Sequence, residues 1–522
     1  MNIDRALIID GLIVAVYFVV IVRIGLRAGR NTGKLEDFTV GGRSIPWWAA
    51  LASIIAAETS AATFLGTPAE GFKNRSFVYG QLVIGTVLAR LVIAYLFLKP
   101  YYHYRVQSVY EFLSLRFGPR TRDLASATFM VTRVLGIGVR LYLGGAIIVV
   151  IWRYLLPDLP VPLATYFWGI LFVATVTAVY TAVGGIKAVV WTDLIQASLM
   201  LCAVVVAIVL LFRGIPEGIS GAGDALGGWE NVSWFQTGWD SELSFGSALA
   251  GMLEEPYTLF AAFIGSTFLT LATHGTDQDM VQRMLTAPDY HKARRALVLS
   301  GLADIPVVIA FLTVGLLLYA HYQNIGHAGL PEADNEIFAY FIVNEIPAGL
   351  RGLVLAGVFG SMMGSTSAAL NALATSFVRD FYQPYFQRGT GDGIRAARVA
   401  TIVFAVLMVL VATVAASAVL KDAKLTIIPL AIGILGYTYG GLLAVFFLGM
   451  LTRRRGSDWG NVFAMMLGNI AVFVLGKVEL FGIQFGGWLP QWWPKIAWSW
   501  YVFIGCAVAL PVAALFRSTE RR

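Results

Sequence analysis

The stretch IIAAETSAATFLG, residues 54–66, lies inside a long apolar segment and yet carries Glu58, Thr59 and Ser60. A carboxylate in a membrane-spanning segment is costly and marks a functional site by default. A second stretch, FLTLATHGTDQDMVQR at residues 268–283, interrupts another apolar segment in the same way. Polar, glycine-containing interruptions at corresponding positions of two halves indicate an inverted repeat that is built with discontinuous helices.

The composition around these stretches is that of a membrane protein. Of the 522 residues, 58% are hydrophobic and 13% are charged, and a soluble domain carries about twice that charged share. A soluble fold of this size cannot bury so much apolar side chain, so an ordinary cytoplasmic enzyme is excluded, as are disordered and fibrous proteins. The two cysteines, Cys202 and Cys506, stand far apart in apolar runs. Neither a disulfide framework nor a cysteine metal site is therefore expected.

Thirteen apolar segments are long enough to cross a bilayer as helices, which takes about 20 residues. The first carries Asp4 and Asp10 beside Arg5 and has no small-residue cleavage site after it, so we expect a retained span and not a signal peptide. The chain is predicted to be an all-α polytopic membrane protein with one transporter domain over 1–522. The spans are expected near 6–25, 44–66, 76–99, 123–153, 162–182, 188–212, 258–282, 293–320, 352–378, 396–419, 425–450, 459–476 and 497–516.

The loops between these segments predict the orientation. Most of the 38 Lys and Arg lie in short loops on the side of the C-terminus, whereas the long loops 213–257 and 321–351 are acidic. The positive-inside rule then places the N-terminus outside and the C-terminus in the cytoplasm. The same distribution explains the net charge of +7 without nucleic acid, so the expected partners are the lipid bilayer and a small-molecule substrate, with no obligate protein partner evident. A short helix is expected around 334–344, and Ser108–Glu111 has the form of a capping box.

The interrupted segments are the second and the seventh span, five spans apart. This spacing predicts two inverted five-helix repeats, near 44–212 and 258–450, with extra helices at 6–25, 459–476 and 497–516. An unwound helix frees carbonyl oxygens for a monovalent cation, and the ends of half-helices attract a charged substrate group. Because the sequence contains no nucleotide-binding loop, an ion gradient would supply the energy for transport.

Four stretches resemble the sodium/solute symporter family, which includes the proline, sialic acid and sugar cotransporters and has the LeuT architecture. They are PWWAALASIIAAETSAATFLG at 46–66, YTAVGGIKAVVWTDLIQ at 180–196, HGTDQDMVQR at 274–283 and STSAALNALATSFVRDFY at 365–382. The GGIKAVVWTD part is the most specific, and the similarity covers essentially the whole chain. The resemblance implies symport of a small organic solute with Na+ by alternating access, in a bacterial inner membrane, and no enzymatic activity.

The resemblance also implies a sodium site between the break in the second span and the ninth span. Carried over position by position, its ligands are Ala56, Thr59, Ser361, Gly364 and Ser365. Most relatives have two adjacent hydroxyl residues at the last two positions, so one hydroxyl is missing here, and Thr366 or water is left to compensate.

A second sodium site is present in some members of the family. Its ligands would match Ser60, Asp193 and Ser367 in this chain. A further serine of that site corresponds to Ala368 here, so this site is also incomplete by comparison with the family.

The substrate positions differ from those of the sugar branch, which has an amide at Ile432 and an aromatic gate at Thr273. A carboxylate or a zwitterion is therefore favoured over a sugar. The arginine that grips a carboxylate in the sialic acid branch aligns with Gly136, and Arg140 projects from the same helix face one turn away. Glu58 stands where the proline branch has an acidic residue. The full set of expected substrate residues is Glu58, Ser60, Thr63, Gln81, Arg140, Thr273, His274 and Tyr437.

Glu58 and Arg140 are then expected to face opposite ends of a zwitterion or to bind a carboxylated substrate. The alternative for Glu58 is a buried ion pair with Arg133 or Arg140. For Arg90 and Arg133 a structural role is expected, and Gln81 and Tyr437 are as consistent with contacts between helices as with a lined cavity.

Two other functions fit parts of the sequence. Glu58, Asp193 and His274 are titratable, which leaves proton-coupled or uncoupled transport as an alternative. A remote alternative is an intramembrane enzyme with a metal bound near His274. The carboxylates Asp277 and Asp279 point about 200° apart on a helix, so we expect them to bond neighbouring backbone or to pair with Arg283. A sensor without flux is disfavoured because the sequence has no attached signalling domain.

Overall fold

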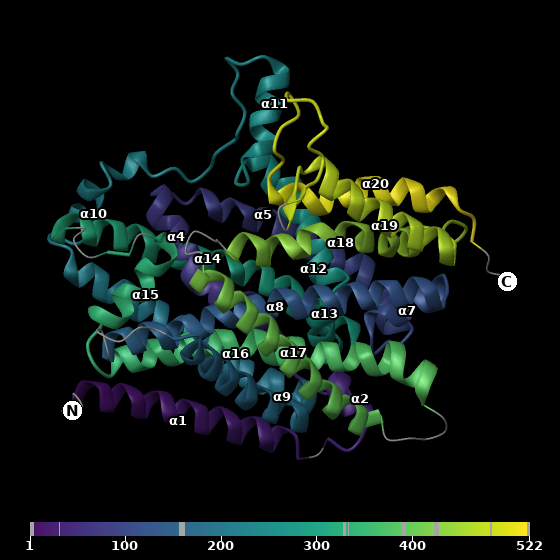
Figure 1. Ribbon diagram of the computed structural model, residues 1–522, viewed down its shortest axis with the longest axis horizontal. Helices are drawn as coiled ribbons and strands as arrows, with labels where there is room; N and C mark the ends of the chain where they lie inside the picture. The colour runs from purple at the N-terminus through teal and green to yellow at the C-terminus, as the bar shows by residue number, and fades with distance from the viewer. Residues whose placement is uncertain are drawn as a thin grey trace.

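The computed structural model describes residues 5–30, 32–155, 162–326, 330–331, 333–387, 393–421, 427–480 and 483–518. Almost all of these residues are helical, and the long helices run side by side along the longest axis of the molecule (Figure 1). The sheet in the described residues is one antiparallel hairpin, β1 (Glu479–Leu480) and β2 (Ile483–Gln484). The all-α fold class is therefore confirmed.

Ten helical runs in the described residues are long and apolar enough to cross a membrane, or eleven if the bent pair α3 and α4 counts as one span. These runs are α1 (Arg5–Ala28), η2 to α6 (Val78–His103), α8 (Pro119–Leu155), α9 (Leu163–Gly214), α14 (Tyr290–Ile325), α16 with η6 (Leu350–Phe386), α17 (Gly393–Lys421), α18 (Ile427–Leu451), α19 (Asp458–Leu475) and η7 with α20 (Trp498–Leu515). The bent pair consists of α3 (Trp47–Glu58) and α4 (Ala61–Asn74).

The expected number of thirteen spans is not confirmed, and two features account for the difference. First, α9 carries the fifth and the sixth expected span in one run of 52 residues. A straight helix of that length rises about 78 Å, more than twice the roughly 30 Å of a hydrocarbon core. The run is divided at Gly185, which has φ 56° and ψ −148°. A side chain there would also meet the backbone oxygen of Phe38 at 2.6 Å, so glycine is required at this kink.

Second, the seventh expected span is divided into pieces that are each too short to cross a membrane alone. They are the π-helical segment η5 (Ala261–Ser266), α12 (Thr267–Gly275) and α13 (Gln278–Leu285). The third expected span is also composite, with η2 (Val78–Leu82), α5 (Val83–Val92), the π-helical η3 (Ile93–Phe97) and α6 (Leu98–His103). Interrupted helices of this kind occur in transporters where backbone lines a binding site.

The shorter elements lie at the ends of the long helices, and two of them were expected. Helix α15 (Asp334–Asn344) confirms the short helix expected in the loop 321–351. Helix α7 (Val109–Arg116) begins where it was expected, with Ser108 as its N-cap. Ser108 Oγ accepts from the Tyr110 amide and Glu111 accepts from the Gln107 amide, so each bond is one residue away from the reciprocal pattern of a capping box. The other short elements are α2 (Leu35–Val40), η1 (Gly41–Arg43), α10 (Ile219–Ala225), η4 (Trp229–Asn231), α11 (Phe245–Glu254) and η7 (Trp498–Trp500).

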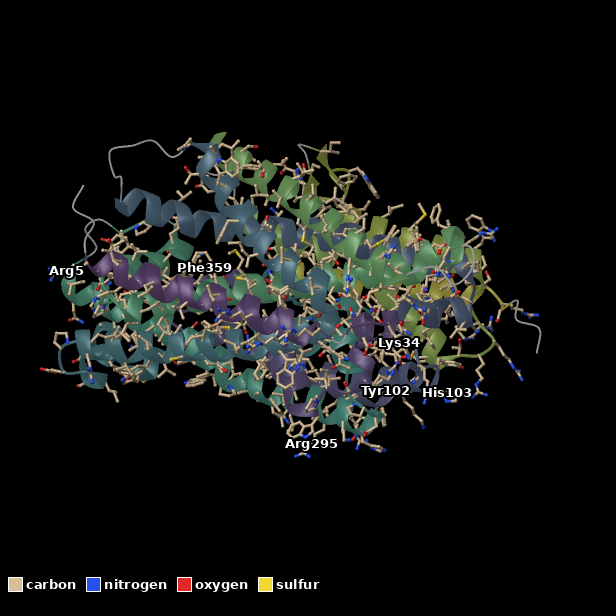
Figure 2. The ribbon with its side chains drawn as sticks, turned by 90° about the horizontal axis from the view of Figure 1, so that it is seen from below. Arg5, Lys34, Tyr102, His103, Arg295 and Phe359 are labelled. Carbon is tan, nitrogen blue, oxygen red and sulfur yellow. The ribbon has the colours of Figure 1, made fainter. Side chains whose placement is uncertain are left out.

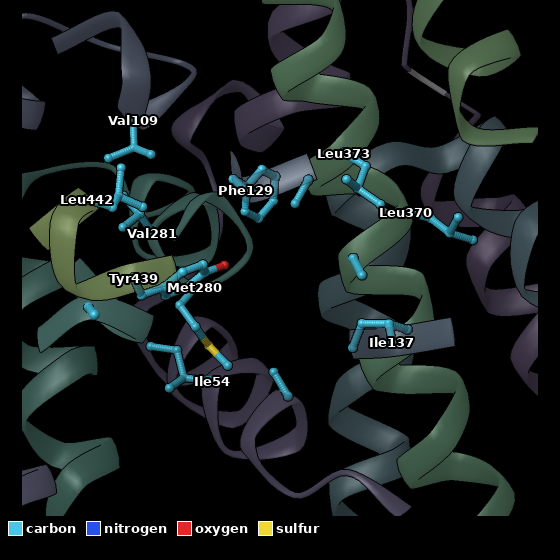
Figure 3. Close-up of a cluster of buried hydrophobic side chains, with 14 of the residues drawn as sticks. Ile54, Val109, Phe129, Ile137, Met280, Val281, Leu370, Leu373, Tyr439 and Leu442 are labelled. Atoms are coloured by element: carbon cyan, nitrogen blue, oxygen red, sulfur yellow. The ribbon is translucent and has the colours of Figure 1, made fainter. Parts of the chain in front are cut away.

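Helix α16 is the centre of the bundle, because 94% of its most apolar window is buried. It packs against α9, α1, α8 and α3. Close by, side chains from six helices meet in one apolar cluster, in which Ile54, Phe129, Met280, Leu370 and Tyr439 are neighbours (Figure 3). The polar residues of α16 are thus held inside a rigid apolar frame.

The outside of the bundle is apolar along whole helices. On α1, for example, Leu12 is 64% exposed and Val16 is 54% exposed. A continuous apolar surface of this extent marks contact with lipid. Helix α1 begins at one end of the bundle and α20 finishes at the other (Figure 1). Lys34 and His103 lie in the half of the molecule away from Arg5 (Figure 2), in keeping with basic loops gathered at one end.

Candidate functional site

The break in the second span lies between Glu58, the last residue of α3, and Ala61, the first residue of α4. The two helices are bent by 59° relative to each other. Hydroxyl groups take over part of the backbone hydrogen bonding there. Thr59 Oγ1 donates to the Ile55 carbonyl at 3.2 Å, and Thr63 Oγ1 donates to the Glu58 carbonyl at 3.3 Å. Polar residues in this stretch therefore stabilise a discontinuous helix, as the sequence predicted.

Glu58 is the centre of a charged cluster formed by four helices. Its Oε1 atom accepts hydrogen bonds from Arg90 on α5 and from His274 on α12. Thr273 Oγ1 lies 3.0 Å from His274 Nδ1, and Asp304 Oδ2 on α14 lies 4.0 Å from Arg90 Nη2. The structure thus brings together three predicted residues, Glu58, Thr273 and His274. The expected alternative partners of Glu58, Arg133 and Arg140, are not the residues that pair with it.

A second buried network joins α13 to α8 and α18. Arg133 bonds Asp277, and its Nη1 lies 3.4 Å from Asp279 Oδ2. Arg283 Nη1 lies 2.5 Å from Asp279 Oδ1, and Tyr439 donates to Asp277 at 2.6 Å. Asp277 also caps α13 by accepting from the Asp279 amide at 2.9 Å. The expected backbone and Arg283 contacts of the two carboxylates are confirmed, and no group of metal-binding side chains is found in the described residues.

The expected sodium ligands are buried and lie on two helices that touch. Helix α16 packs against α3, and Ser365 Oγ donates to the carbonyl of Ser361 at 3.2 Å or of Met362 at 3.1 Å. A hydroxyl that donates its proton within the helix keeps its lone pairs for a cation. Thr366 Oγ1 donates to the Met362 carbonyl at 2.8 Å, so it too keeps acceptor capacity. The buried ligand positions are Ala56, Thr59, Ser361, Gly364 and Ser365.

The residues of the second expected sodium site make contacts of another kind, because one of them pairs with an arginine. Asp193 Oδ2 accepts from Ser53 at 2.5 Å and lies 3.4 Å from Arg283 Nη2. Ser367 Oγ donates to the Gly364 carbonyl at 3.1 Å, while Ser60 Oγ lies 3.4 Å from Thr63 Oγ1. Asp193 is thus already engaged on one oxygen by a cation of the protein.

Two further predicted residues, Gln81 and Tyr437, lie apart from each other. Gln81 donates to the carbonyls of Gln236 and Tyr257, which belong to the stretch between α9 and η5. It also lines a mostly apolar cavity of about 430 Å³. Tyr437 packs on Phe473 and Tyr501, with ring centres 5.0 and 5.4 Å apart, which is a contact between helices. The side chain of Ile432 lies outside the described residues.

Arg140 is a half-buried guanidinium on α8, and its Nε atom has no hydrogen-bond partner within the described residues. The charged groups nearest to it include Arg133, Asp279 and Asp277, so it faces the α13 network. No carboxylate of the described chain lies within ion-pair distance of it. Other interior arginines, in contrast, are paired: Arg90 with Glu58, Arg133 with Asp277 and Arg283 with Asp279.

The comparison with known families agrees with this arrangement. The model of the sodium:solute symporter family matches residues 38–468. The chain belongs to this family. The prediction made from the four sequence stretches is thereby confirmed, and Na+ is the coupling ion of the family.

Individual proteins show how far the similarity of this symporter extends. A sodium/sialic acid symporter of Aliivibrio fischeri is 28% identical over 454 residues, which are 85% of this chain and 83% of that protein. Sodium-coupled monocarboxylate transporter 2 of Danio rerio is 28% identical over 473 residues, 88% of this chain and 70% of that protein. A solved Na+-coupled sialic acid symporter superimposes with a TM-score of 0.77 at 21% identity, over 97% of each chain. The last similarity confirms the LeuT-type fold.

The sequence analysis missed two residues of these networks, Asp304 and Tyr439. Arg90 was expected to be structural, paired or snorkelling, and its ion pair with Glu58 agrees with this expectation, but neither this partner nor Asp304 was identified. The sequence did contain a signal for Arg90 and Asp304. Both are charged residues in apolar spans, where charged residues usually pair with one another. Tyr439 was missed in favour of Tyr437, although it is the tyrosine that bonds Asp277.

Proposed function

We propose that this symporter carries a small organic carboxylate, or a zwitterion with a carboxylate group, into the cell together with sodium. The observation that supports the substrate class is Arg140, an interior cation that has no carboxylate partner in the described chain. A guanidinium that is removed from water is expensive unless it is paired. Its planar fork fits a carboxylate with two parallel hydrogen bonds. The substrate would supply the missing anion.

In this proposal only one carboxylate oxygen of Glu58 is left for the solute. Because Arg90 and His274 both bond Glu58 Oε1, this oxygen is engaged by the protein and is not offered to the solute. The Oε2 atom of Glu58 has no partner among the described residues. That atom is available to an ammonium or hydroxyl group of the solute, so a zwitterion is compatible with the site.

The relatives support the same class. Two of the similar proteins are named for sialic acid and for monocarboxylates, which are both carboxylates. We extend this shared property to the present chain because Arg140 offers the group that would recognise it. The orientation belongs to the same proposal: the N-terminus outside and the C-terminus in the cytoplasm of a bacterial inner membrane, supported by the distribution of Lys and Arg.

The test is uptake into proteoliposomes under an imposed sodium gradient. Labelled sialic acid, lactate and proline are offered, with glucose as the neutral solute. One of the carboxylates should accumulate only with sodium. Arg140→Gln should lower that uptake roughly 100-fold, since each hydrogen bond to a charged group contributes about 1.5–3 kcal/mol, and Arg140→Lys should retain part of it.

The matched control is Arg120→Gln, because Arg120 lies over Trp459 and makes no ion pair with the interior network. Its uptake should equal that of the wild type. Unchanged uptake by Arg140→Gln, or sodium-driven accumulation of glucose alone, would contradict the proposed substrate class.

Proton coupling is the second candidate, and one observation favours it. Asp304 places a second carboxylate near Arg90, which is already bonded to Glu58. A proton on His274 would balance the charge of this cluster, which otherwise holds two carboxylates against one guanidinium. Uptake driven by a pH gradient in the absence of sodium, and lost in His274→Gln, would favour this candidate over sodium.

A further inference from the structure

Gly364, the position where the hydroxyl of most relatives is missing, faces α9. A side-chain carbon on Gly364 would lie 2.8 Å from Oε1 of Gln196 and 3.4 Å from Oδ1 of Asp193. A distance of 2.8 Å is shorter than van der Waals contact between carbon and oxygen. The amide oxygen of Gln196 therefore occupies the space that a serine side chain at position 364 would need.

Both of these oxygens are buried and without a protein partner. Gln196 is 1% exposed and Asp193 is fully buried. Neither Gln196 Oε1 nor Asp193 Oδ1 has a hydrogen-bond partner in the residues that the structure describes. An unsatisfied buried acceptor costs about 1–3 kcal/mol. Two such oxygens side by side form a site for a group that takes oxygen lone pairs, such as a cation.

The second polar atom of each residue is held by a hydrogen bond to the protein. These hydrogen bonds fix the orientation of the free oxygens. Gln196 Nε2 donates to the Tyr17 hydroxyl at 3.4 Å. Asp193 Oδ2 is held by Ser53 at 2.5 Å and by Arg283 at 3.4 Å. Since the two residues are three positions apart on α9, they lie on one face of that helix. Their free oxygens therefore converge on the same point of α16.

This point adjoins the sodium site that the family resemblance implies. Ser53, which bonds Asp193, lies one turn before Ala56 on α3. Ser365, with its acceptor lone pairs available, follows Gly364 directly on α16. Carbonyl and carboxylate oxygens are the ligands that symporters offer to a coupling cation. Gln196 thus faces Gly364, one of the ligand positions that the resemblance implies, in the space opened by the glycine.

We propose that the side-chain carbonyl of Gln196 binds the coupling sodium ion in place of the hydroxyl that is missing at Gly364, with Asp193 Oδ1 beside it. This inference rests on the proposed sodium-coupled function and names a ligand of the same site. Gly364 leaves the room in which the amide oxygen of Gln196 lies.

The test measures sodium binding without any organic solute. Thermal unfolding of the purified protein in detergent is followed against sodium chloride, with choline chloride added to keep the ionic strength constant. A ligand that binds only the folded protein raises the midpoint in a saturable way, and this rise gives an apparent Kd for sodium. The variants are Gln196→Ala, Gly364→Ser and the double variant Gln196→Ala/Gly364→Ser.

The proposal predicts that Gln196→Ala raises the apparent Kd at least 10-fold. Gly364→Ser alone should also weaken sodium binding, because the new side chain displaces the amide. The double variant should return to within about 3-fold of the wild type, since the serine hydroxyl then has room and replaces the lost carbonyl. Gln282→Ala is the matched control, a buried glutamine that bonds Asn371 and Thr375. It should lower the midpoint equally with and without sodium and leave the apparent Kd unchanged.

An unchanged apparent Kd in Gln196→Ala would overturn the proposal, and so would a double variant that binds sodium as weakly as Gln196→Ala. If Gln196→Ala does not fold, Gln196→Leu keeps the volume and carries the same test. A wild-type protein that sodium does not stabilise would overturn both this inference and the sodium part of the proposed function. Because no solute is present, failure of the carboxylate proposal leaves these outcomes unaffected.

Discussion

Arg90→Met is expected to destabilise the symporter strongly, because it leaves Glu58 without its guanidinium partner inside the bundle. Arg90 is 1% exposed and bonds Glu58 directly. Removing one member of a buried ion pair typically costs about 3–5 kcal/mol. The same change also removes the attraction of Arg90 for Asp304, 4.0 Å away, which is about 4 kcal/mol before desolvation at an effective dielectric constant near 20. Since His274 still bonds Glu58, we expect the net loss to stay within about 3–5 kcal/mol.

The assay is a double-mutant cycle measured by unfolding in mixed micelles. It compares the wild type, Arg90→Met, Glu58→Gln and the double variant. In the double variant no uncompensated carboxylate remains at the helix break. Its cost should therefore be at least about 2 kcal/mol smaller than the sum of the two single costs, within the range that contacting residues show. The control is Arg294→Met, an arginine of α14 that stacks over Tyr95 and Tyr290, with an expected loss of at most about 1 kcal/mol.

The reasoning would be refuted by a loss below about 1 kcal/mol in Arg90→Met, or by a cycle that is additive. Either result would mean that Glu58 is solvated or protonated in the folded protein. Water-filled space would then reach the break between α3 and α4, and the buried-cluster description of the site would have to be abandoned.

Two further predictions concern single interactions. Tyr439→Phe removes the hydroxyl that donates to the Asp277 carboxylate at 2.6 Å, so unfolding in mixed micelles should show a loss of about 1.5–3 kcal/mol; a neutral result would mean that this hydrogen bond is not made in the membrane. Asp289 caps α14 outside the membrane, and the backbone hydrogen bond from the first turn of that helix lowers its pKa. Asp289→Ala should cost about 1 kcal/mol at neutral pH. Because the pKa of the folded state is depressed, this contribution is complete above the unfolded value of about 4 and is lost as the pH falls through the folded value. Thermal scans of both proteins from pH 7 to pH 3 should therefore converge, and a constant gap would contradict the assignment.

The broken helices and the capped ones could be predicted because their signals are local. The polar residues around Thr59 and the stretch before Gln278 mark interruptions in apolar segments, and the structure divides the helices at both places. The start of α7 at Ser108 is marked by four consecutive positions only. In each case the residues that decide the backbone are neighbours in the sequence, so no knowledge of the packing is required.

The partners inside the bundle could not be predicted, because they depend on how distant helices are rotated. Arg90, Arg133 and Arg140 are all arginines inside apolar spans, and nothing local selects one of them for Glu58. The choice follows from the packing of α5 against α12 and α14.

The tyrosines of α18 show the same limit. Tyr437 and Tyr439 are two residues apart and so point in nearly opposite directions. Because the helix is apolar on every side, the periodicity of the sequence does not reveal which tyrosine faces the interior.

The arrangement of charges offers a physical basis for coupling between ion and solute. Asp193, beside the proposed sodium ligand, contacts Arg283, and Arg283 pairs with Asp279. Asp279 lies 3.4 Å from Arg133, which precedes Arg140 on α8 by two turns and so shares its face. A series of ion pairs thus runs from the proposed ion site to Arg133, two turns before Arg140 on α8.

Contact alone does not establish coupling, which is a free energy measured between two ligands. If sodium changes the position of Arg283 by attracting Asp193, the effect reaches Arg140 through Asp279 and Arg133, which are buried and therefore weakly screened. Linkage then requires that the carboxylate raise the affinity for sodium by the same factor by which sodium raises the affinity for the carboxylate. The network lies between the ion site on α9 and α16 and the carboxylate site on α8, so one ion pair can be exchanged for another within the apolar frame around α16.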